Sequence, residues 1–195
     1  MTRKMMMERL KSAVERSVVP CENPSKIIVF DVETTGLYSG DDEIVQFSAI
    51  DGAGNVLLNT YVKPYLKRSW PEAAAITGIT PEVVADAPYA DEIIPKVRGL
   101  FEAADLWISY NGIFDLGFLH YWGVVKPEHK QHYDVMRKFA PIYGDYNSYY
   151  GDYKWQKLGT AAAYYGYDFK AHDSLEDVRA TLFVYQQIEK HDQND

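Results

Sequence analysis

The sequence predicts an α/β fold in which a mixed β-sheet is flanked by helices. Strand-like apolar runs come first along the chain, and strand and helix patterns alternate after them, which is typical of this class. A chain of 195 residues is long enough for one hydrophobic core and too short to need two. We therefore expect one domain over residues 26–190, preceded by a lead-in over 1–25 and followed by a tail over 191–195.

Apolar patterns and turn residues place the elements in order. The lead-in should be helical or loosely ordered and should end near Pro20 and Pro24. Strands are predicted at 27–33, 43–50, 56–62 and 106–110, and the Gly-rich residues 51–55 should join the second and third as a hairpin. Helices are predicted at 71–77, 81–85, 89–103, 113–122, 135–139, 155–165 and 173–189. Pro141 should limit the fifth helix, and segment 143–153 should be a loop.

Charge and composition exclude several classes of protein. A formal net charge of −8 argues against broad nucleic-acid binding through a basic surface. It leaves room for an enzyme that holds a few nucleotides at a metal-filled cleft, since clustered carboxylates would add to the acidic balance. Cys21 is the only cysteine, so neither an internal disulfide nor a cysteine zinc cluster is possible. We find no secretory signal and no apolar run of membrane-spanning length, which favours the cytoplasm and no membrane.

Two carboxylates stand one residue apart at the end of the first predicted strand. Side chains alternate between the two faces of a strand, so Asp31 and Glu33 should point the same way. Two like charges placed together repel each other unless something positive lies between them. The pair therefore predicts a metal site.

Two further acids and a histidine lie near the starts of predicted helices. Asp115 falls in the first turn of the helix after the fourth strand, where an acid also stabilises a helix dipole. Asp173 and Glu176 have the spacing of a capping box, which places His172 just outside the last helix and Asp177 one turn inside it. Taken singly, the histidine also fits a surface residue, and Asp177 also fits a solvated acid.

Taken together, these residues form a coherent catalytic set. Four carboxylates at the ends of separate elements are hard oxygen ligands, which suit Mg²⁺ or Mn²⁺ better than zinc. Two such ions clamp the attacking and leaving oxygens of an in-line phosphoryl displacement. A histidine supplies the proton acceptor for the attacking water. The predicted members of the set are Asp31, Glu33, Asp115, Asp177 and His172.

Three segments resemble the three motifs of the DnaQ-like, or DEDDh, 3′→5′ exonucleases. They are residues 30–37 (FDVETTGL), 110–119 (YNGIFDLGFL) and 172–181 (HDSLEDVRAT). Shorter matches at 63–64, 76–81 and 134–136 are common in the polymerase III proofreading branch of the family. The resemblance covers roughly residues 26–189.

The resemblance implies a ribonuclease-H-like fold, two divalent ions (Mg²⁺ or Mn²⁺) and removal of nucleotides one at a time from a 3′ end. By motif position, it implies that Asp31, Glu33 and Asp177 ligate metal directly. It further implies that Asp115 holds the second ion through water and that His172 is the general base.

The family pattern also implies contacts with the terminal nucleotide. The backbone near Thr34 and the side chain of Leu37 would meet it, with Leu37 wedged against the base. Asn111 and Phe114 would shape the same pocket, whereas Asp134 would have a structural role.

Two features are unusual for the family. Many members carry a histidine where this chain has Tyr110, which affects a neighbouring pocket contact but not the metal chemistry. The predicted loop 143–153 is rich in tyrosine, namely Tyr143, Tyr146, Tyr149, Tyr150 and Tyr153. Such side chains stack on single-stranded bases, cover a sheet or form contacts between copies, and the sequence leaves these alternatives open.

The leading hypothesis is a metal-dependent 3′→5′ exonuclease that releases nucleoside monophosphates from single-stranded 3′ ends, with DNA favoured over RNA. A ribonuclease of the same family is the near alternative, because sugar preference depends on contacts near the 2′ position. A non-catalytic relative should have lost a catalytic position, and a glycosidase would leave the histidine and two acids unexplained. Few residues follow the last predicted helix, which favours a free-standing nuclease or an isolated proofreading subunit of a DNA polymerase.

Overall fold

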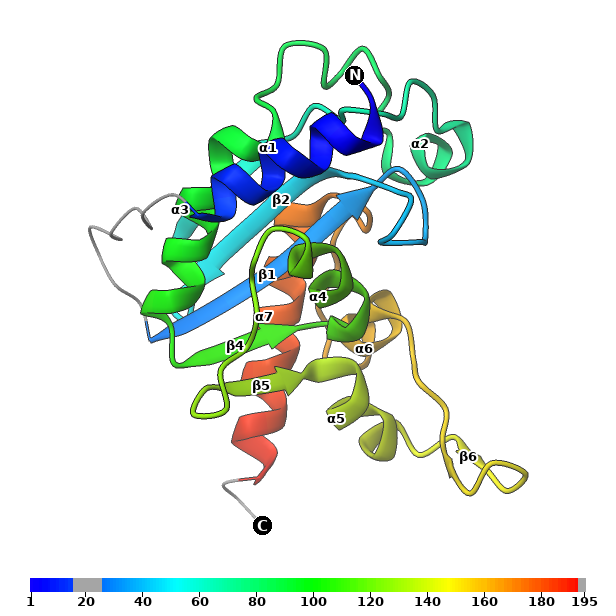
Figure 1. Cartoon of the computed structure of the whole chain (residues 1–195). Coiled ribbons are helices and arrows are strands. Elements are labelled where there is room, and N and C mark those ends of the chain that lie inside the picture. Colours follow the sequence, from blue (N-terminus) through cyan, green and yellow to red (C-terminus); the bar gives the residue numbers. More distant parts are fainter. Residues whose placement is uncertain (16–25, 193–195) are drawn as a thin grey trace.

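The computed structural model describes residues 1–15 and 26–192, and a five-stranded mixed sheet forms its centre (Figure 1). The strands are β1 (Ile27–Thr34), β2 (Ile44–Asp51), β3 (Val56–Tyr61), β4 (Leu106–Ser109) and β5 (Gln131–Asp134). Their order in the sheet is β3-β2-β1-β4-β5. The first three strands form an antiparallel meander, whereas β4 and β5 run parallel to β1. The mixed α/β fold predicted from the sequence is therefore confirmed.

Helices cover both faces of this sheet. They are α1 (Arg3–Glu15), α2 (Pro71–Thr77), α3 (Ala90–Ala103), α4 (Gly112–His120), α5 (Val135–Tyr143), α6 (Leu158–Tyr164) and α7 (Ser174–Asp192). Helices α1 and α3 share one core with the sheet, and α5, α6 and α7 share another. Over the described residues, no helix combines the length and the apolar character that crossing a membrane requires.

The alternation of side chains along β1 decides where its two acids point. Phe30 and Val32 are buried in the core that contains α3, while Val29 is buried in the core that contains α7. Asp31 and Glu33 have the same parity as Val29, so they lie on the face that α7 covers. Each fully buried side chain of this size stabilises the fold by roughly 1.5–3 kcal/mol, which holds the strand in a single register.

The predicted helix at 81–85 is wrong. This stretch forms successive turns in which Val83, Ala85 and Ala87 each donate a backbone hydrogen bond to a carbonyl three residues earlier. Five residues are too few to offset the entropy of nucleating a helix in the absence of a broad buried face.

Helix α5 continues past Pro141, which the sequence predicted to limit it. The helix reaches Tyr143 and ends where Gly144 adopts a φ of 82°. Proline removes one backbone donor near the end of the helix, and packing of its buried apolar face against the core compensates for that loss.

Other elements also differ from the predictions. The fifth strand was missed because residues 131–134 are short and polar, and α6 begins at Leu158 rather than at residue 155. The predicted loop 143–153 contains a small hairpin, formed by β6 (Tyr146–Asn147) and β7 (Asp152–Tyr153). The predicted end of the lead-in at Pro20 and Pro24 lies outside the described residues.

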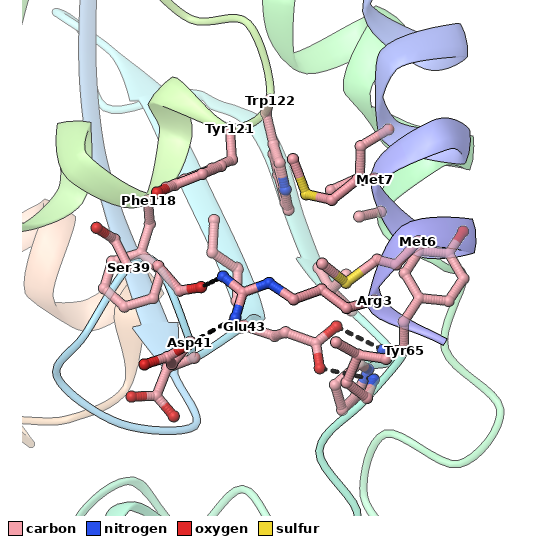
Figure 2. A pocket seen from close by; sticks show the side chains of 18 of the residues that line it. Arg3, Met6, Met7, Ser39, Asp41, Glu43, Tyr65, Phe118, Tyr121 and Trp122 are labelled. Carbon is pink, nitrogen blue, oxygen red and sulfur yellow. Dashed lines mark hydrogen bonds and ion pairs between the residues drawn. The ribbon is translucent and has the colours of Figure 1, made fainter. Parts of the chain in front are cut away.

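Helix α1 lies beside α3 and reaches the loop that follows β1 (Figure 2). The Arg9 guanidinium pairs with the largely buried Asp91 carboxylate of α3 at 2.8 Å. Met6 and Leu10 are buried against the core, next to Trp122. At the start of the helix, the Arg3 guanidinium donates to Asp41 Oδ1 at 2.7 Å and so contacts the β1–β2 loop.

Candidate active site

Three separate elements bring acidic side chains to one end of the sheet. Asp31 and Glu33 lie near the end of β1, Asp115 lies in the first turn of α4, and Asp177 lies in the first turn of α7. One ligand atom each from Glu33, His172 and Asp177 lie within 4.8 Å of one another. Three of the five predicted catalytic residues, distant in sequence, therefore form one potential ligand group.

The turn before α7 positions the histidine. His172 is exposed and has a φ of 68°, so the chain bends sharply just before the helix begins. Its backbone N–H donates to Asp177 Oδ2 at 3.2 Å. One residue later, the Asp173 carboxylate accepts from the N–H of Leu175 at 3.1 Å, which is the expected N-cap bond.

The predicted reciprocal half of that capping box is not formed. The Glu176 carboxylate instead pairs with Arg179 one turn further along the helix, at 2.5 Å. Ser174 is fully buried, and its hydroxyl donates to the backbone carbonyl of Asp31 at 3.2 Å. This bond fastens the start of α7 to β1, which keeps Asp177 beside the strand acids.

Asp115 joins the site through α4. It is only 2% exposed, and its Oδ1 accepts a hydrogen bond from the Val32 N–H at 3.1 Å, so it is more than a partner of the helix dipole. The preceding Asn111 adopts a left-handed conformation with a φ of 64°. The Asp134 carboxylate accepts from the N–H groups of Asn111 and Gly112 at 3.3 and 3.0 Å, which gives Asp134 a structural role in this turn.

Burial raises the pKa of all four acids. It raises the pKa of Asp31 well above its usual value and that of Glu33 to about 7. It raises the pKa of Asp115 to about 8 and that of Asp177 to about 7. Repulsion adds to burial, because Asp115, Glu33 and Asp177 all act on Asp31. Ionising all four acids together at neutral pH therefore requires a compensating positive charge.

Two buried carboxylate oxygens in the cluster are candidates to contact a compensating positive charge. Asp31 Oδ2 and Asp177 Oδ1 have no hydrogen-bond partner among the described residues. Buried polar atoms are nearly always paired, so two such atoms on adjacent carboxylates need an explanation. An oxygen-rich donor set with one imidazole fits a hard divalent cation, and it lacks the thiolates of a structural zinc site.

A pocket of about 550 Å³ opens beside the acids. Glu33, Thr34, Leu37 and Phe114 line it, so three of the four predicted substrate contacts share one cavity. Asn111 is not among the residues that line this pocket. Sequence analysis did not predict the residues of the opposite wall. They are Lys67, Ser69, Trp70, Pro71, Glu72, Ala73, Ile76 and Thr77.

Asp42 connects the two walls of this pocket. Its Oδ1 accepts from Thr35 Oγ1 at 3.0 Å and pairs with Lys67 Nζ at 2.9 Å, while its Oδ2 accepts from Tyr38 N at 3.1 Å. Gly36 is required beside it, since a Cβ at that position would come within 2.5 Å of the Asp42 carboxylate. Residues 39–42 (SGDD) indicate an acidic turn in the sequence, but nothing in that pattern points to Lys67, 25 residues after Asp42.

The mixed five-stranded sheet flanked by helices has the ribonuclease-H-like α/β fold, and acidic residues lie at the end of its central strand. Comparison with known proteins makes the assignment specific. The sequence model of the family described as Exonuclease matches residues 28–185, and the chain belongs to this family. It is a nuclease that acts on nucleic acid.

The chain is similar to relatives of several kinds. It is 37% identical over 175 residues to an uncharacterized exonuclease of Escherichia phage 186, covering 84% of this chain and 88% of that protein. It is 29% identical to a PolC-type DNA polymerase III of Thermotoga maritima, covering 81% of this chain but 11% of the polymerase. A crystal structure of E. coli exonuclease I with single-stranded DNA and zinc shares the fold, with a TM-score of 0.67 and 23% identity. That match covers 87% of this chain and 41% of exonuclease I.

Proposed function

We propose that this protein is a 3′→5′ exonuclease that releases nucleoside monophosphates from single-stranded 3′ ends, with DNA as the favoured substrate. The observation that carries the proposal is the grouping of Glu33, His172 and Asp177 within 4.8 Å, beside a pocket of nucleotide size. All five residues that the family motifs require are present in the chain. This argues against a non-catalytic relative.

The acids fit two Mg²⁺ or Mn²⁺ ions. Asp31, Glu33 and Asp177 would hold metal directly, and Asp115 would hold the second ion through water. The unpaired Asp31 Oδ2 and Asp177 Oδ1 support this assignment. Bound ions would supply charge neutralisation for the attacking and leaving oxygens of an in-line displacement.

His172 would act as the general base. Its exposed position lets the imidazole meet a water that enters from solvent, and it is the only histidine in the ligand group described above. The bond from its own backbone to Asp177 limits the motion of the turn, so the imidazole stays beside the acids. A base in this position removes the proton of the water as the water attacks phosphorus.

The pocket would receive the terminal nucleotide. Leu37 is 75% exposed at the rim, where its side chain would wedge against the last base, and Phe114 lines the same cavity. Thr34 Oγ1 donates to the carbonyl of Gly36 at 2.6 Å, which orders the backbone that would meet the sugar. Asn111 would act from outside the lining, by shaping the turn that precedes Phe114.

Two relatives support DNA as the substrate. One is a DNA polymerase and the other was crystallised with single-stranded DNA. They also motivate a second candidate, a proofreading subunit that works with a DNA polymerase. The alternative substrate is RNA, whose 3′ ends the same site would trim.

The decisive experiment is a time course with 3′- and 5′-labelled strands of DNA and of RNA. We expect 5′-labelled DNA to shorten as a ladder in Mg²⁺ or Mn²⁺, and 3′ label to appear at once as mononucleotide. Asp177→Asn, prepared in parallel, controls for contaminating nuclease. Unchanged digestion in excess chelator would remove the metal assignment, and faster digestion of RNA would reverse the sugar preference.

A further inference from the structure

A tyrosine-rich segment projects from the body of the protein. Figure 1 shows the chain around β6 extending away from the sheet, beyond α5 and α6. We call residues 143–155 the aromatic arm. It contains five of the 16 tyrosines of the chain, and it ends with Trp155. Its rings are unusually open to solvent, because Tyr149 is 86% exposed and Tyr150 is 77% exposed.

The arm is a preformed hairpin. Tyr146 pairs with Tyr153 across the two short strands, and the Lys154 N–H donates to the carbonyl of Asp145 at 2.9 Å. At the tip, the Asn147 side chain accepts from the N–H of Tyr149 at 3.0 Å. A ligand that binds these rings therefore meets a surface whose backbone is already ordered.

Four tyrosine rings of the arm pair with each other and stay open to solvent, which argues against the alternative that they cover the sheet. Tyr146 and Tyr153 contact each other edge to face, with centroids 5.3 Å apart, and both stay more than a third exposed. Tyr149 and Tyr150 form a second edge-to-face pair at 4.9 Å. Large exposed aromatic surfaces of this kind mark an interaction site.

A hydrogen bond links the residue after the arm to the turn that precedes α4. The Tyr110 hydroxyl donates to the carbonyl of Gln156 at 2.8 Å, and Gln156 follows directly after the arm. Tyr110 is also the first residue of the second motif, five positions before Asp115. The residue that replaces the histidine common in the family thus anchors the arm beside the catalytic turn. The six residues from Tyr150 to Gln156 could span at most about 20 Å if they were fully extended, so the tip of the arm lies no further than that from the anchored end.

Local charge favours a nucleic-acid strand as the occupant. Residues 137–157 hold four basic and two acidic side chains, although the chain as a whole has a net charge of −8. The Arg137 guanidinium lies over the Trp155 ring at 5.9 Å, next to the anchored end of the arm. Aromatic rings with interspersed cations stack on bases and attract the phosphate backbone.

We propose that the aromatic arm binds the single strand several nucleotides upstream of its 3′ end. This inference rests on the proposed function, since it assigns a second contact to the same substrate. The tip tyrosines would stack on bases while the basic side chains near the base of the arm follow the backbone. The arm would thereby raise affinity for strands long enough to reach it and leave the chemical step unchanged.

The test compares three substrates of different length, of which only the longest could extend from the active site to the arm. They are the p-nitrophenyl ester of thymidine 5′-monophosphate, an oligothymidylate of three nucleotides and one of 15 nucleotides. The test variant is Tyr149→Ala/Tyr150→Ala in the full chain. Tyr149→Phe/Tyr150→Phe keeps the rings, and Tyr61→Ala removes a tyrosine that is 43% exposed on β3.

We expect the double alanine variant to raise KM for the 15-mer by about 10-fold or more and to leave its kcat unchanged. KM for the trimer and the ester should not change, and the phenylalanine variant should resemble the wild type. Equal KM values for wild type and double alanine on the 15-mer would overturn the proposal. A change of oligomeric state by sedimentation, without a change in KM, would also overturn it and would identify the arm as a contact between copies.

The two proposals fail in different ways. If the wild type hydrolyses neither the ester nor any oligonucleotide, the proposed function is wrong. Fluorescence anisotropy with the labelled 15-mer in chelator then still tests the arm. Weaker binding by the double alanine variant than by Tyr61→Ala supports the inference, and equal binding contradicts it.

Discussion

At the scale of single residues, the site is a set of acids that the fold holds together against their mutual repulsion. Asp31 is surrounded by three other carboxylates, and burial removes the water that would otherwise screen them. The serine bond from α7 and the N–H of Val32 fix the geometry but carry no full positive charge. Such an arrangement lowers the free energy of unfolding of the metal-free protein, and a bound cation would offset the repulsion among the acids.

Replacing one acid by its amide separates a metal role from a structural one. We expect Asp177→Asn to lower kcat on the order of 10³-fold while keeping the fold, because the amide has the same shape without the charge. In chelator, the melting temperature should stay the same or rise, since repulsion within the cluster falls. Asp105→Asn, at an exposed acid paired with Lys26, is the matched control and should change neither quantity.

Loss of the His172 imidazole should lower kcat more than it changes KM. His172→Ala should lower kcat by about 10²–10⁴-fold, the usual range for loss of a general base, with little change in KM. His129→Ala removes another exposed histidine and should leave the rate unchanged. A His172→Ala enzyme with normal single-turnover rates on a short oligonucleotide would show that another group accepts the proton.

At the scale of elements, the pocket is held by contacts between loops rather than by the sheet itself. Asp42 connects the loop after β1 with the segment before α2, and its side chain is only 8% exposed. Burial would raise the pKa of Asp42, but hydrogen bonds from Lys67, Tyr38 and Thr35 hold it below its usual value. The ionised carboxylate therefore acts as a clasp between the two walls.

Loss of this clasp should loosen the pocket without touching the chemistry. We expect Asp42→Asn to raise KM several-fold for all oligonucleotides, with a smaller effect on kcat. Lys67→Gln and the double variant complete a mutant cycle. Non-additive effects on KM would indicate that the Asp42–Lys67 ion pair holds the pocket, whereas additive effects would mean that Lys67 contacts the substrate independently of Asp42.

At the scale of the whole molecule, the raised pKa values make stability depend on pH and on metal. Unfolded carboxylates titrate near pH 4, whereas Glu33 and Asp177 titrate at about 7 and Asp115 at about 8 in the folded chain. Between these limits the folded state binds more protons than the unfolded state. These acids therefore lower the free energy of unfolding of the metal-free protein as pH rises from about 4 to about 8.

Thermal unfolding in chelator and in Mg²⁺ measures this linkage. We expect the melting temperature of the wild type in chelator to fall by roughly 5 °C or more from pH 5.5 to 8.5. The melting temperature of Asp177→Asn should fall less steeply with pH, and the difference between the two proteins measures the contribution of the acids. Mn²⁺ or Mg²⁺ should restore more stability at pH 8.5 than at pH 5.5, because the ions bind the ionised acids. A metal effect independent of pH would contradict the assigned ligands.

Local pattern was a reliable guide to the long elements. The apolar run at 27–33 and the Gly-rich hairpin at 51–55 each depend on near neighbours, so β1, β2 and β3 were predicted to within about one residue. The short polar strand β5 had no such signal, since its place is decided by pairing with β4. The stretch at 81–85 carried a helix signal that tertiary packing did not support.

The sequence by itself determined the family and the predicted set of acids and histidine, because motif residues and their spacing are properties of the chain alone. Only the tertiary structure decided which of them meet, because contact between residues 33 and 177 depends on how α7 packs against β1. It placed Lys67 and Trp70 across the pocket, left Asn111 outside it, and joined Tyr110 to the base of the aromatic arm. Long-range packing of this kind is a property of the whole core, so no local pattern encodes it.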